Sequence, residues 1–418
     1  MTTHFPETFW WGIAASSPQG EGAAPASDWR AWELAEKVPP SGAGNGFATT
    51  YAEDFRRCAE YGLRHYRLGI EWARIEPEAG RRDPEAVEHY RAVLEAARET
   101  GIEPWVCLHH FTLPVWLTED GSGFCDERAR TYYWRRHVEF VAETYGSLVF
   151  GWQPVNEPLN YAINGFLDGV FPPGARDQNL AGVALEGAYL ASAEAAGVLR
   201  QTAKPVATVQ ALAPVFPADD SEDSAAVVDF VEEAAWGCWL RALREGVLTV
   251  PGRPPVAVPA FVEAFDLIGF SYYSAVGLAS GPRLVPYPPG ARVGPLSYAP
   301  WSDGLGLVLD RLTWELPGRA FLVAEHGVGT DDDAWRCEIL HDSLRIVADR
   351  VNRGMDLRGF FHWTGVDNYE WQHGFEVPFG IFDRARRPRA SAELLGHVAT
   401  SGRLPTSGND YETRFGVK

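Results

Sequence analysis

Two glutamates far apart in the chain each follow an apolar run with the character of a buried strand. The first run is WQPVNEP at 152–158, which contains Glu157, and the second is FLVAEHG at 321–327, which contains Glu325. A carboxylate at the mouth of a buried strand is costly unless it has a function. Two such carboxylates facing each other are the machinery of glycoside hydrolysis. The plainer interpretation is two ordinary glutamates at strand ends.

Short apolar runs alternate with longer amphipathic stretches along the chain. Residues 83–101 illustrate a predicted helix: Asp83 is an N-cap, Pro84 takes the first helical position, and Gly101 closes the helix. Further helices are expected at 132–145, 181–201, 224–244, 303–314 and 334–353. The predicted strands are Phe9–Ala15, His65–Ile70, Pro104–His109, Val149–Asn156, Val206–Gln210, Leu267–Tyr272, Ala320–Glu325 and Gly359–Trp363.

This alternation predicts a single (β/α)8 barrel with long loops at the catalytic face. A doubly wound open sheet is the alternative, but it needs a glycine-rich phosphate turn after an early strand, and none stands there. We expect one catalytic domain over residues 1–400 and a partly disordered tail over 401–418. The Pro- and Gly-rich stretch at 280–300 is interpreted as a catalytic-face loop.

Both glutamates fall at the same end of the predicted barrel, and other strand ends carry side chains suited to sugars. Residues 16–22, 108–114 and 362–371 are rich in amides, imidazoles, carboxylates and indoles. The polar groups can bind sugar hydroxyls, and indoles pack on the apolar face of a pyranose. The chain has 16 tryptophans, of which a sugar enzyme would use several.

On these motifs the chain resembles glycoside hydrolase family 1, the β-glucosidase family, from about Phe5 to Pro388. The resemblance lies in Asn-Glu-Pro at 156–158, Glu-x-Gly at 325–327 and Asp-Asn-x-Glu-Trp at 367–371, with support from 9–14 and 67–74. It implies that Glu157 is the acid/base and Glu325 the nucleophile. It also implies roles in holding the sugar or the nucleophile for Gln19, Arg67, His110, Phe111, Asn156, Tyr273, Trp363, Glu370 and Trp371.

The resemblance assigns these further roles individually. Asn156 matches the residue that binds the 2-hydroxyl, and Gln19, His110 and Glu370 match those that hold the 3-, 4- and 6-hydroxyls. Trp363 and Trp371 match the stacking and edge tryptophans. Tyr273 would hydrogen-bond the nucleophile, and Arg67 beneath it would keep Glu325 ionised.

Five positions depart from the usual family pattern. Phe111 replaces Trp, which removes an N–H donor near the 3-hydroxyl, and Ser271 replaces Asn, which weakens a contact to the nucleophile. Thr is usual at Pro154 and at Ala324, and Asn is usual at His326. None of these changes removes a catalytic group, so they bear on substrate preference and rate rather than on reaction type.

The implied activity is that of a retaining, exo-acting β-glycosidase, foremost a β-glucosidase that can also act on galactosides or fucosides. The substrate is a small β-glycoside or short oligosaccharide, and no cofactor or metal is expected. Three alternatives stay open: a transglycosylating member, a 6-phospho-β-glycosidase, and a catalytically silent sugar-binding relative. Glu370 disfavours the second because it would repel phosphate, and the presence of both glutamates disfavours the third.

Composition limits the kinds of partner and the cellular compartment that we expect for this chain. The formal net charge of −19 argues against nucleic acid and anionic membranes as partners. The N-terminus lacks the pattern of a signal peptide, and five scattered cysteines favour a reduced, cytoplasmic setting. His109 and His362 are interpreted as structural, and residues 386–389 as a solvated turn. The oligomeric state is not predicted.

Overall fold

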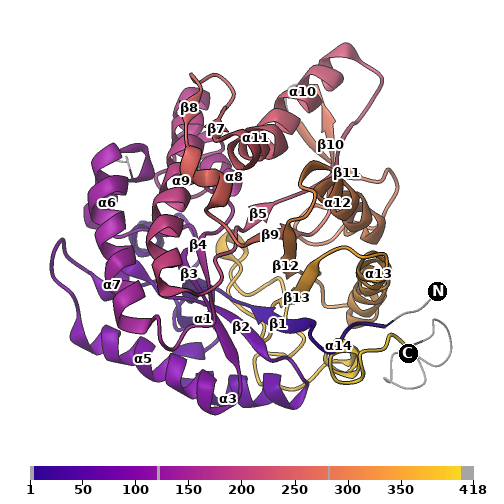
Figure 1. Cartoon of the computed structure of the whole chain (residues 1–418), viewed down its shortest axis with the longest axis horizontal. Coiled ribbons are helices and arrows are strands. Elements are labelled where there is room, and N and C mark those ends of the chain that lie inside the picture. The colour runs from indigo at the N-terminus through magenta and orange to yellow at the C-terminus, as the bar shows by residue number, and fades with distance from the viewer. Residues whose placement is uncertain (1–3, 120–122, 281–282, 406–418) are drawn as a thin grey trace.

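The central element of the computed structural model is a parallel sheet of eight strands in the order β4-β3-β2-β1-β13-β12-β9-β5 (Figure 1). The structure describes residues 4–119, 123–280 and 283–405. Parallel bridges from Trp152 to Val206 and from Asn156 to Val209 join β4 to the segment leading into β5, so the sheet closes on itself. The predicted (β/α)8 barrel is therefore confirmed. The barrel strands are β1 (Trp10–Ala14), β2 (His65–Gly69), β3 (Glu103–His109), β4 (Gly151–Val155), β5 (Gln210–Ala211), β9 (Leu267–Tyr272), β12 (Ala320–His326) and β13 (Leu357–Trp363).

Helices surround these strands, as Figure 1 shows. The helix α5 forms as predicted: the Asp83 side chain accepts from the backbone N–H groups of residues 85 and 86, Pro84 begins the helix, and Tyr90 and Leu94 are fully buried. The barrel helices are α3 (Phe47–Glu60), α5 (Pro84–Glu99), α7 (Arg135–Tyr145), α9 (Gln178–Leu199), α10 (Glu222–Glu232), α11 (Cys238–Glu245), α12 (Ser302–Glu315), α13 (Asp333–Asn352) and α14 (Ala390–Ser401). The short helices are α1 (Ser17–Glu21), α2 (Asp28–Leu34), α4 (Trp72–Ile75), α6 (Val115–Thr118) and α8 (Pro158–Ala162).

The apolar core has two parts that follow the alternation of side chains along the strands. One part fills the inside of the barrel and includes Trp105, Leu322, Ala324 and Phe361. The other, larger part lies between the strands and the helices and includes Val323 of the same strand β12. A barrel filled in this way is a packed core, so a ligand can be received only at an end of it.

Four predicted elements differ from the structure. The strand expected at Val206–Gln210 is β5 at Gln210–Ala211, and Val206, Ala207 and Val209 form isolated bridges before it. Residues 129–134 and 233–237 are π-helical, so the helix expected at 132–145 begins with a wider turn and the helix expected at 224–244 is interrupted by one. The loop expected at 280–300 contains a strand, β11 (Arg283–Tyr287), which pairs antiparallel with β10 (Ala275–Ala279). With β6 (Val215–Pro217) these strands form a separate three-stranded sheet near α10; β7 (Val247–Leu248) and β8 (Val256–Ala257) form a two-stranded ribbon.

The interpretation of residues 386–389 as a solvated turn is wrong. Arg386 pairs with the buried Asp54 at 3.0 Å, and Arg389 pairs with Asp367 at 2.6 Å. Buried carboxylates need cationic or hydrogen-bonding partners, and these come from residues far away in the sequence. Only Arg387 of this group of arginines is strongly exposed, at 80% of its side-chain surface.

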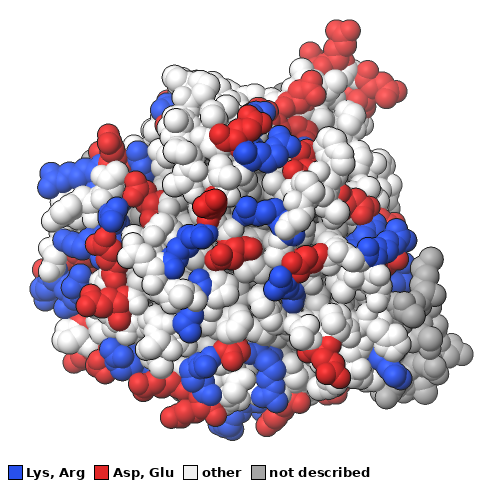
Figure 2. All heavy atoms as spheres, in the orientation of Figure 1, with Lys and Arg blue, Asp and Glu red and all other residues white. Residues whose placement is uncertain are grey.

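Acidic and basic side chains are intermixed over most of the face in Figure 2, and acidic side chains gather at the end where α10 lies. No helix within the described parts of the chain is both long and apolar enough to cross a bilayer. The predicted tail lies mostly outside the described residues, which end at 405; Ser401 still belongs to α14.

Candidate active site

A cavity of about 440 Å³ opens at the carboxyl ends of the barrel strands. This is the face on which barrel enzymes build their active sites. Every predicted site residue except Arg67 lines the cavity: Gln19, His110, Phe111, Asn156, Glu157, Tyr273, Glu325, Trp363, Glu370 and Trp371. Arg67 is fully buried and touches the cavity residues from beneath.

Glu325 reaches the cavity because strand β12 is irregular at its end. Leu322 and Ala324 face the inside of the barrel, so strict alternation would turn Glu325 outward toward the helices. The pairing with β9 and β13 shifts between Val323 and His326, as in a β-bulge. The shift places Glu325 at the cavity and turns His326 outward, against Tyr272 and Phe360.

Two side chains hold the Glu325 carboxylate. Arg67 Nη2 lies 2.5 Å from Oε1, and Tyr273 donates a hydrogen bond of 2.7 Å to Oε2. Arg67 also donates a 2.9 Å bond to Asn156 Oδ1. Burial acts to lower the pKa of Arg67, but the charge of Glu325, the hydrogen bond to it and the nearby Cys107 and Tyr273 together outweigh burial, and the pKa is raised. Arg67 therefore stays cationic, and the Glu325 carboxyl group is contacted at both oxygens.

Glu157 is presented differently, at the turn between β4 and α8. Its φ is +46°, a left-handed conformation that is strained for a glutamate, and Pro158 follows as the first residue of α8. Asn160, one turn later, donates a hydrogen bond of 2.8 Å to Glu157 Oε2. Burial, and next the charge of Glu325, raise the pKa of Glu157 to about 7, although Ser271, Asn160 and Arg67 act to lower it. Glu157 therefore keeps its proton to higher pH than an exposed glutamate does.

Glu370 and Gln19 form a third polar group in the cavity. Ser16 donates to Gln19 Oε1 at 2.7 Å, which leaves the Gln19 amide N–H₂ to donate to Glu370 Oε2 at 3.0 Å and to the carbonyl of Tyr369 at 2.9 Å. Burial, followed by the charge of Glu325, raises the pKa of Glu370 to about 8. This pair can both donate to and accept from the hydroxyls of a bound sugar.

Aromatic rings line one side of these polar groups. The imidazole of His110 lies nearly parallel to the rings of Trp363 and Trp371, at centroid distances of 5.7 and 6.1 Å. Burial, with a contribution from Arg67, lowers the pKa of His110 well below its ordinary value, so the ring is neutral. Phe111 and Trp371 both adopt positive φ, at +71° and +47°, which is strained for aromatic residues. Strained backbone of this kind is concentrated at functional sites.

The remaining predicted residues take structural positions. His109 packs against Phe124 and Tyr161, as predicted, and His362 is buried on β13. Ser271 pairs in register with Glu325 across β9 and β12. Position 327, two residues after Glu325, requires glycine because a Cβ there would overlap the carbonyl of Trp363.

About half of the residues in the described cavity wall were not identified individually from the sequence. Asn160 could have been predicted, because a side chain three positions after Glu157 in a helix lies on the same face as Glu157. The others come from loops whose course the pattern did not define. The missed lining residues are Asn160, Asn164, Phe171, Leu284, Leu296, Tyr298, Gln372, His373 and Phe379.

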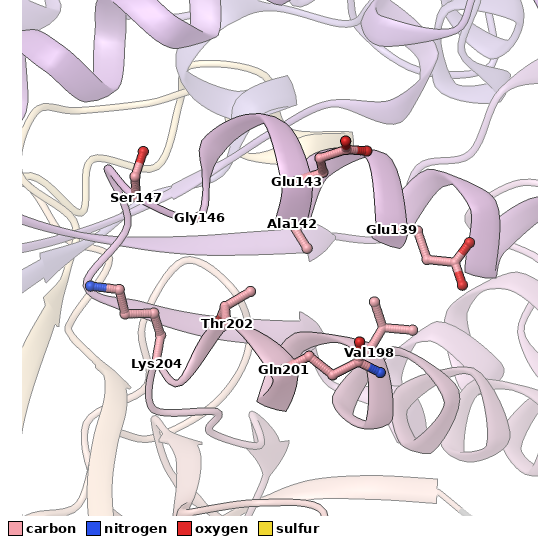
Figure 3. A pocket seen from close by; sticks show the side chains of 9 residues that line it. All are labelled: Glu139, Ala142, Glu143, Gly146, Ser147, Val198, Gln201, Thr202 and Lys204. Atoms are coloured by element: carbon pink, nitrogen blue, oxygen red, sulfur yellow. The ribbon is translucent and has the colours of Figure 1, made fainter.

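A larger hollow, of about 580 Å³, lies elsewhere, at the ends of α7 and α9 (Figure 3). Glu139 and Glu143 come from α7 on one side of it, and Thr202 and Lys204 come from the other side. Both carboxylates therefore belong to one wall rather than facing each other. The helix ends that form it lie at the amino ends of the strands, the face of a barrel associated with stability. The chemistry therefore favours the smaller cavity.

Comparisons with known proteins agree with this geometry. The sequence model of "Glycosyl hydrolase family 1" matches residues 1–246 and 295–403. "Thermostable beta-glucosidase B" of Thermobispora bispora is 30% identical, over 93% of this chain and 89% of that protein. "Beta-glucosidase A" of Thermotoga maritima is 28% identical, over 90% of this chain and 92% of that protein.

Solved structures give the same picture. A "beta-glycosidase from Pyrococcus horikoshii" superimposes with a TM-score of 0.89 at 29% identity, covering 100% of this chain and 99% of that one. A "Beta-glucosidase from Thermotoga maritima in complex with glucoimidazole" has a TM-score of 0.87 at 24% identity, covering 96% of this chain and 100% of that one; it supports the fold.

Proposed function

The chain belongs to glycosyl hydrolase family 1 and is a glycoside hydrolase of the β-glucosidase type, and we propose that it removes the non-reducing-end sugar of small β-glycosides with retention of configuration. The observation that carries this proposal is the unequal setting of the two glutamates. Glu325 is held by Arg67 and Tyr273, whereas burial and the charge of Glu325 raise the pKa of Glu157 to about 7. A carboxyl group that keeps its proton to higher pH can act as the acid, and a carboxyl group held by an arginine and a tyrosine can act as the nucleophile.

In the first step Glu325 Oε attacks the anomeric carbon. The bond to the aglycone oxygen breaks, and Glu157 gives its proton to that oxygen, so the aglycone leaves as a neutral alcohol. The products are a glycosyl ester on Glu325 and an ionised Glu157. Asn160 supports this ionised form, because its amide donates to Glu157 Oε2.

In the second step Glu157 takes a proton from water, and the water oxygen attacks the anomeric carbon. The ester bond breaks, Glu325 regains its charge, and Glu157 is protonated again. Arg67 and Tyr273 then stabilise the departing carboxylate. Since both attacks invert the anomeric carbon, the net result is retention.

The sugar is proposed to lie on Trp363, with its hydroxyls held by Gln19, His110, Asn156 and Glu370. Among the described residues that line the cavity there is no lysine or arginine, and Glu370 carries negative charge once ionised. A phosphate on the sugar would therefore lack a cationic partner, which disfavours a 6-phospho-β-glycosidase. Transfer to an alcohol instead of water uses the same first step and differs only in the acceptor.

The test is the stereochemistry of the first-formed product. Proton NMR of a freshly started hydrolysis of an aryl β-glucoside should show β-glucose before mutarotation. An α-product would overturn the retaining mechanism. A second test is Glu157→Ala with a good leaving group, because its ester intermediate then lacks a base for water. Added azide should restore turnover and yield a β-glycosyl azide; absence of rescue in a folded variant contradicts the role of Glu157.

A further inference from the structure

Beyond the groups assigned to the sugar, the described cavity wall contains four apolar side chains, Phe171, Leu284, Leu296 and Phe379. This inference rests on the proposed function and concerns the group on the leaving side of the scissile bond. Leu284 and Leu296 line the cavity, and both come from the segment between β9 and α12. Leu284 is 69% exposed. Several large apolar side chains among the described residues are strongly exposed, and of these Leu284 lines the cavity.

The position of Leu284 is fixed by backbone pairing. It lies on β11, opposite Leu278 of β10, and Leu278 is buried. The hairpin is joined to β6 by parallel pairing of β10, so it is part of a sheet. A large apolar side chain held in the open at the mouth of a substrate cavity is a surface to which an apolar group can bind.

Leu296 and Tyr298 continue this surface toward the reacting groups. Leu296 packs against the apolar cluster that contains Trp363 and Phe379. The ring of Tyr298 lies 6.4 Å from that of Tyr273, which donates to Glu325. Apolar side chains therefore line the cavity both near the groups around Glu325, at Leu296, and where it is exposed to solvent, at Leu284.

Five of the nine other described lining residues, Asn160, Asn164, Tyr298, Gln372 and His373, carry polar groups, and those of Asn160 and Gln372 are already hydrogen-bonded. Asn160 donates to Glu157, and Gln372 donates to the carbonyl of Val170 at 2.9 Å. Of the described lining residues not assigned to the sugar, Asn164 and His373 are the other hydrogen-bonding amide and imidazole. A second sugar unit presents several hydroxyls that each need a partner, whereas an apolar group needs none.

The charged groups of the cavity also favour a neutral aglycone over an anionic one. The charged side chains that line the described part of the cavity are glutamates, with no lysine or arginine to receive an anion. We propose that the preferred substrates carry a neutral, apolar aglycone, an alkyl chain or an unsubstituted aryl ring, which binds against Leu284 and Leu296. Saccharide and anionic aglycones are the disfavoured classes.

The test compares two alkyl glucosides whose leaving groups are nearly equally basic but differ in apolar length, and adds a disaccharide. We would measure kcat/KM for methyl β-D-glucoside, octyl β-D-glucoside and cellobiose with the purified full chain. Burying even a few methylene groups should give octyl glucoside an advantage of about tenfold or more over methyl glucoside. Leu284→Ser and Leu296→Ser should each lower the octyl-to-methyl ratio by roughly threefold or more. Leu307→Ser is the matched control, because Leu307 is 45% exposed on α12 and should leave the ratio unchanged.

Calorimetric binding of methyl and octyl β-D-thioglucoside gives a second readout that needs no turnover. A flat octyl-to-methyl ratio, or a cellobiose value above that of octyl glucoside, overturns the apolar aglycone. A ratio that survives both cavity substitutions overturns the assignment to Leu284 and Leu296. If no β-glucoside is hydrolysed but octyl thioglucoside binds more tightly and Leu284→Ser abolishes the difference, the proposed function fails while the apolar surface stands.

Discussion

The hydrogen bond from Asn160 to Glu157 predicts a shift in the pH profile when it is removed. The bond, 2.8 Å long, is received by a carboxylate oxygen and so favours the ionised form of Glu157. Hydrogen bonds to charged groups contribute about 1.5–3 kcal/mol and those between neutral groups about 0.5–1.5 kcal/mol. The difference is about 1 kcal/mol, and because one pKa unit corresponds to 1.36 kcal/mol it amounts to roughly 0.7 units.

The sign follows from the role of Glu157 as an acid. Glu157 must be protonated to assist departure, so kcat/KM falls as the pH rises through its pKa of about 7. Asn160→Ala should raise that pKa and move the basic limb upward to roughly pH 7.7. At about pH 8 the wild type should keep about a tenth of its plateau value and the variant about a third.

The assay is kcat/KM for an alkyl glucoside across the pH range, because a poor leaving group depends on the acid. Asn164→Ala is the matched control, since Asn164 lines the same cavity and Asn160 is the residue bonded to Glu157. A basic limb that stays in place or moves downward in Asn160→Ala refutes the reasoning. So does an equal shift in the control.

Three other substitutions test the electrostatics of the site. In the wild type, ionisation of the buried Glu157 lowers the free energy of unfolding; this cost is absent below about pH 4.5 and complete above about pH 7. Glu157→Gln should therefore raise the free energy of unfolding by up to about 3 kcal/mol at about pH 8 and by less at about pH 5, as measured by thermal unfolding. An equal gain at both pH values contradicts this. Arg67→Met leaves Glu325 buried without its cation and should cost about 3–5 kcal/mol in denaturant unfolding, whereas the exposed Arg358→Met should change little; equal costs would show that the buried pair has no special weight. Glu370→Ser should lower kcat/KM more for glucosides than for fucosides, which lack the 6-hydroxyl, and an equal loss on both would remove Glu370 from that contact.

The sequence predicted most of the inner site because strand ends in a barrel converge. Once Glu157 and Glu325 were assigned to strand ends, their meeting at one face followed from parallel strand geometry. Motifs then identified Gln19, His110 and Glu370, which the structure brings to the same cavity. These residues depend on local spacing, which a sequence displays directly.

Most of what the sequence did not predict depends on contacts between distant segments. Strict alternation in β12 would have turned Glu325 away from the barrel mouth, and the register shift after Val323 reverses this. The pairing of β10 with β11, which exposes Leu284 at the cavity, is local in sequence and was not predicted because the whole Pro- and Gly-rich stretch was interpreted as a loop. The ion pairs of Arg386 with Asp54 and of Arg389 with Asp367 could not be predicted either, because the two aspartates lie in other segments of the chain.

The central claim is that Glu325 forms a covalent bond to the sugar while Glu157 moves the proton. The most direct measurement is mass spectrometry after incubation with a 2-deoxy-2-fluoro-β-glucoside that carries a good leaving group. The fluorine destabilises both positively charged transition states, and the leaving group keeps the first step fast enough for the ester to accumulate. The account predicts one fluoroglucosyl group per chain, located on Glu325 after peptic digestion. A label on Glu157 or on any other residue contradicts it.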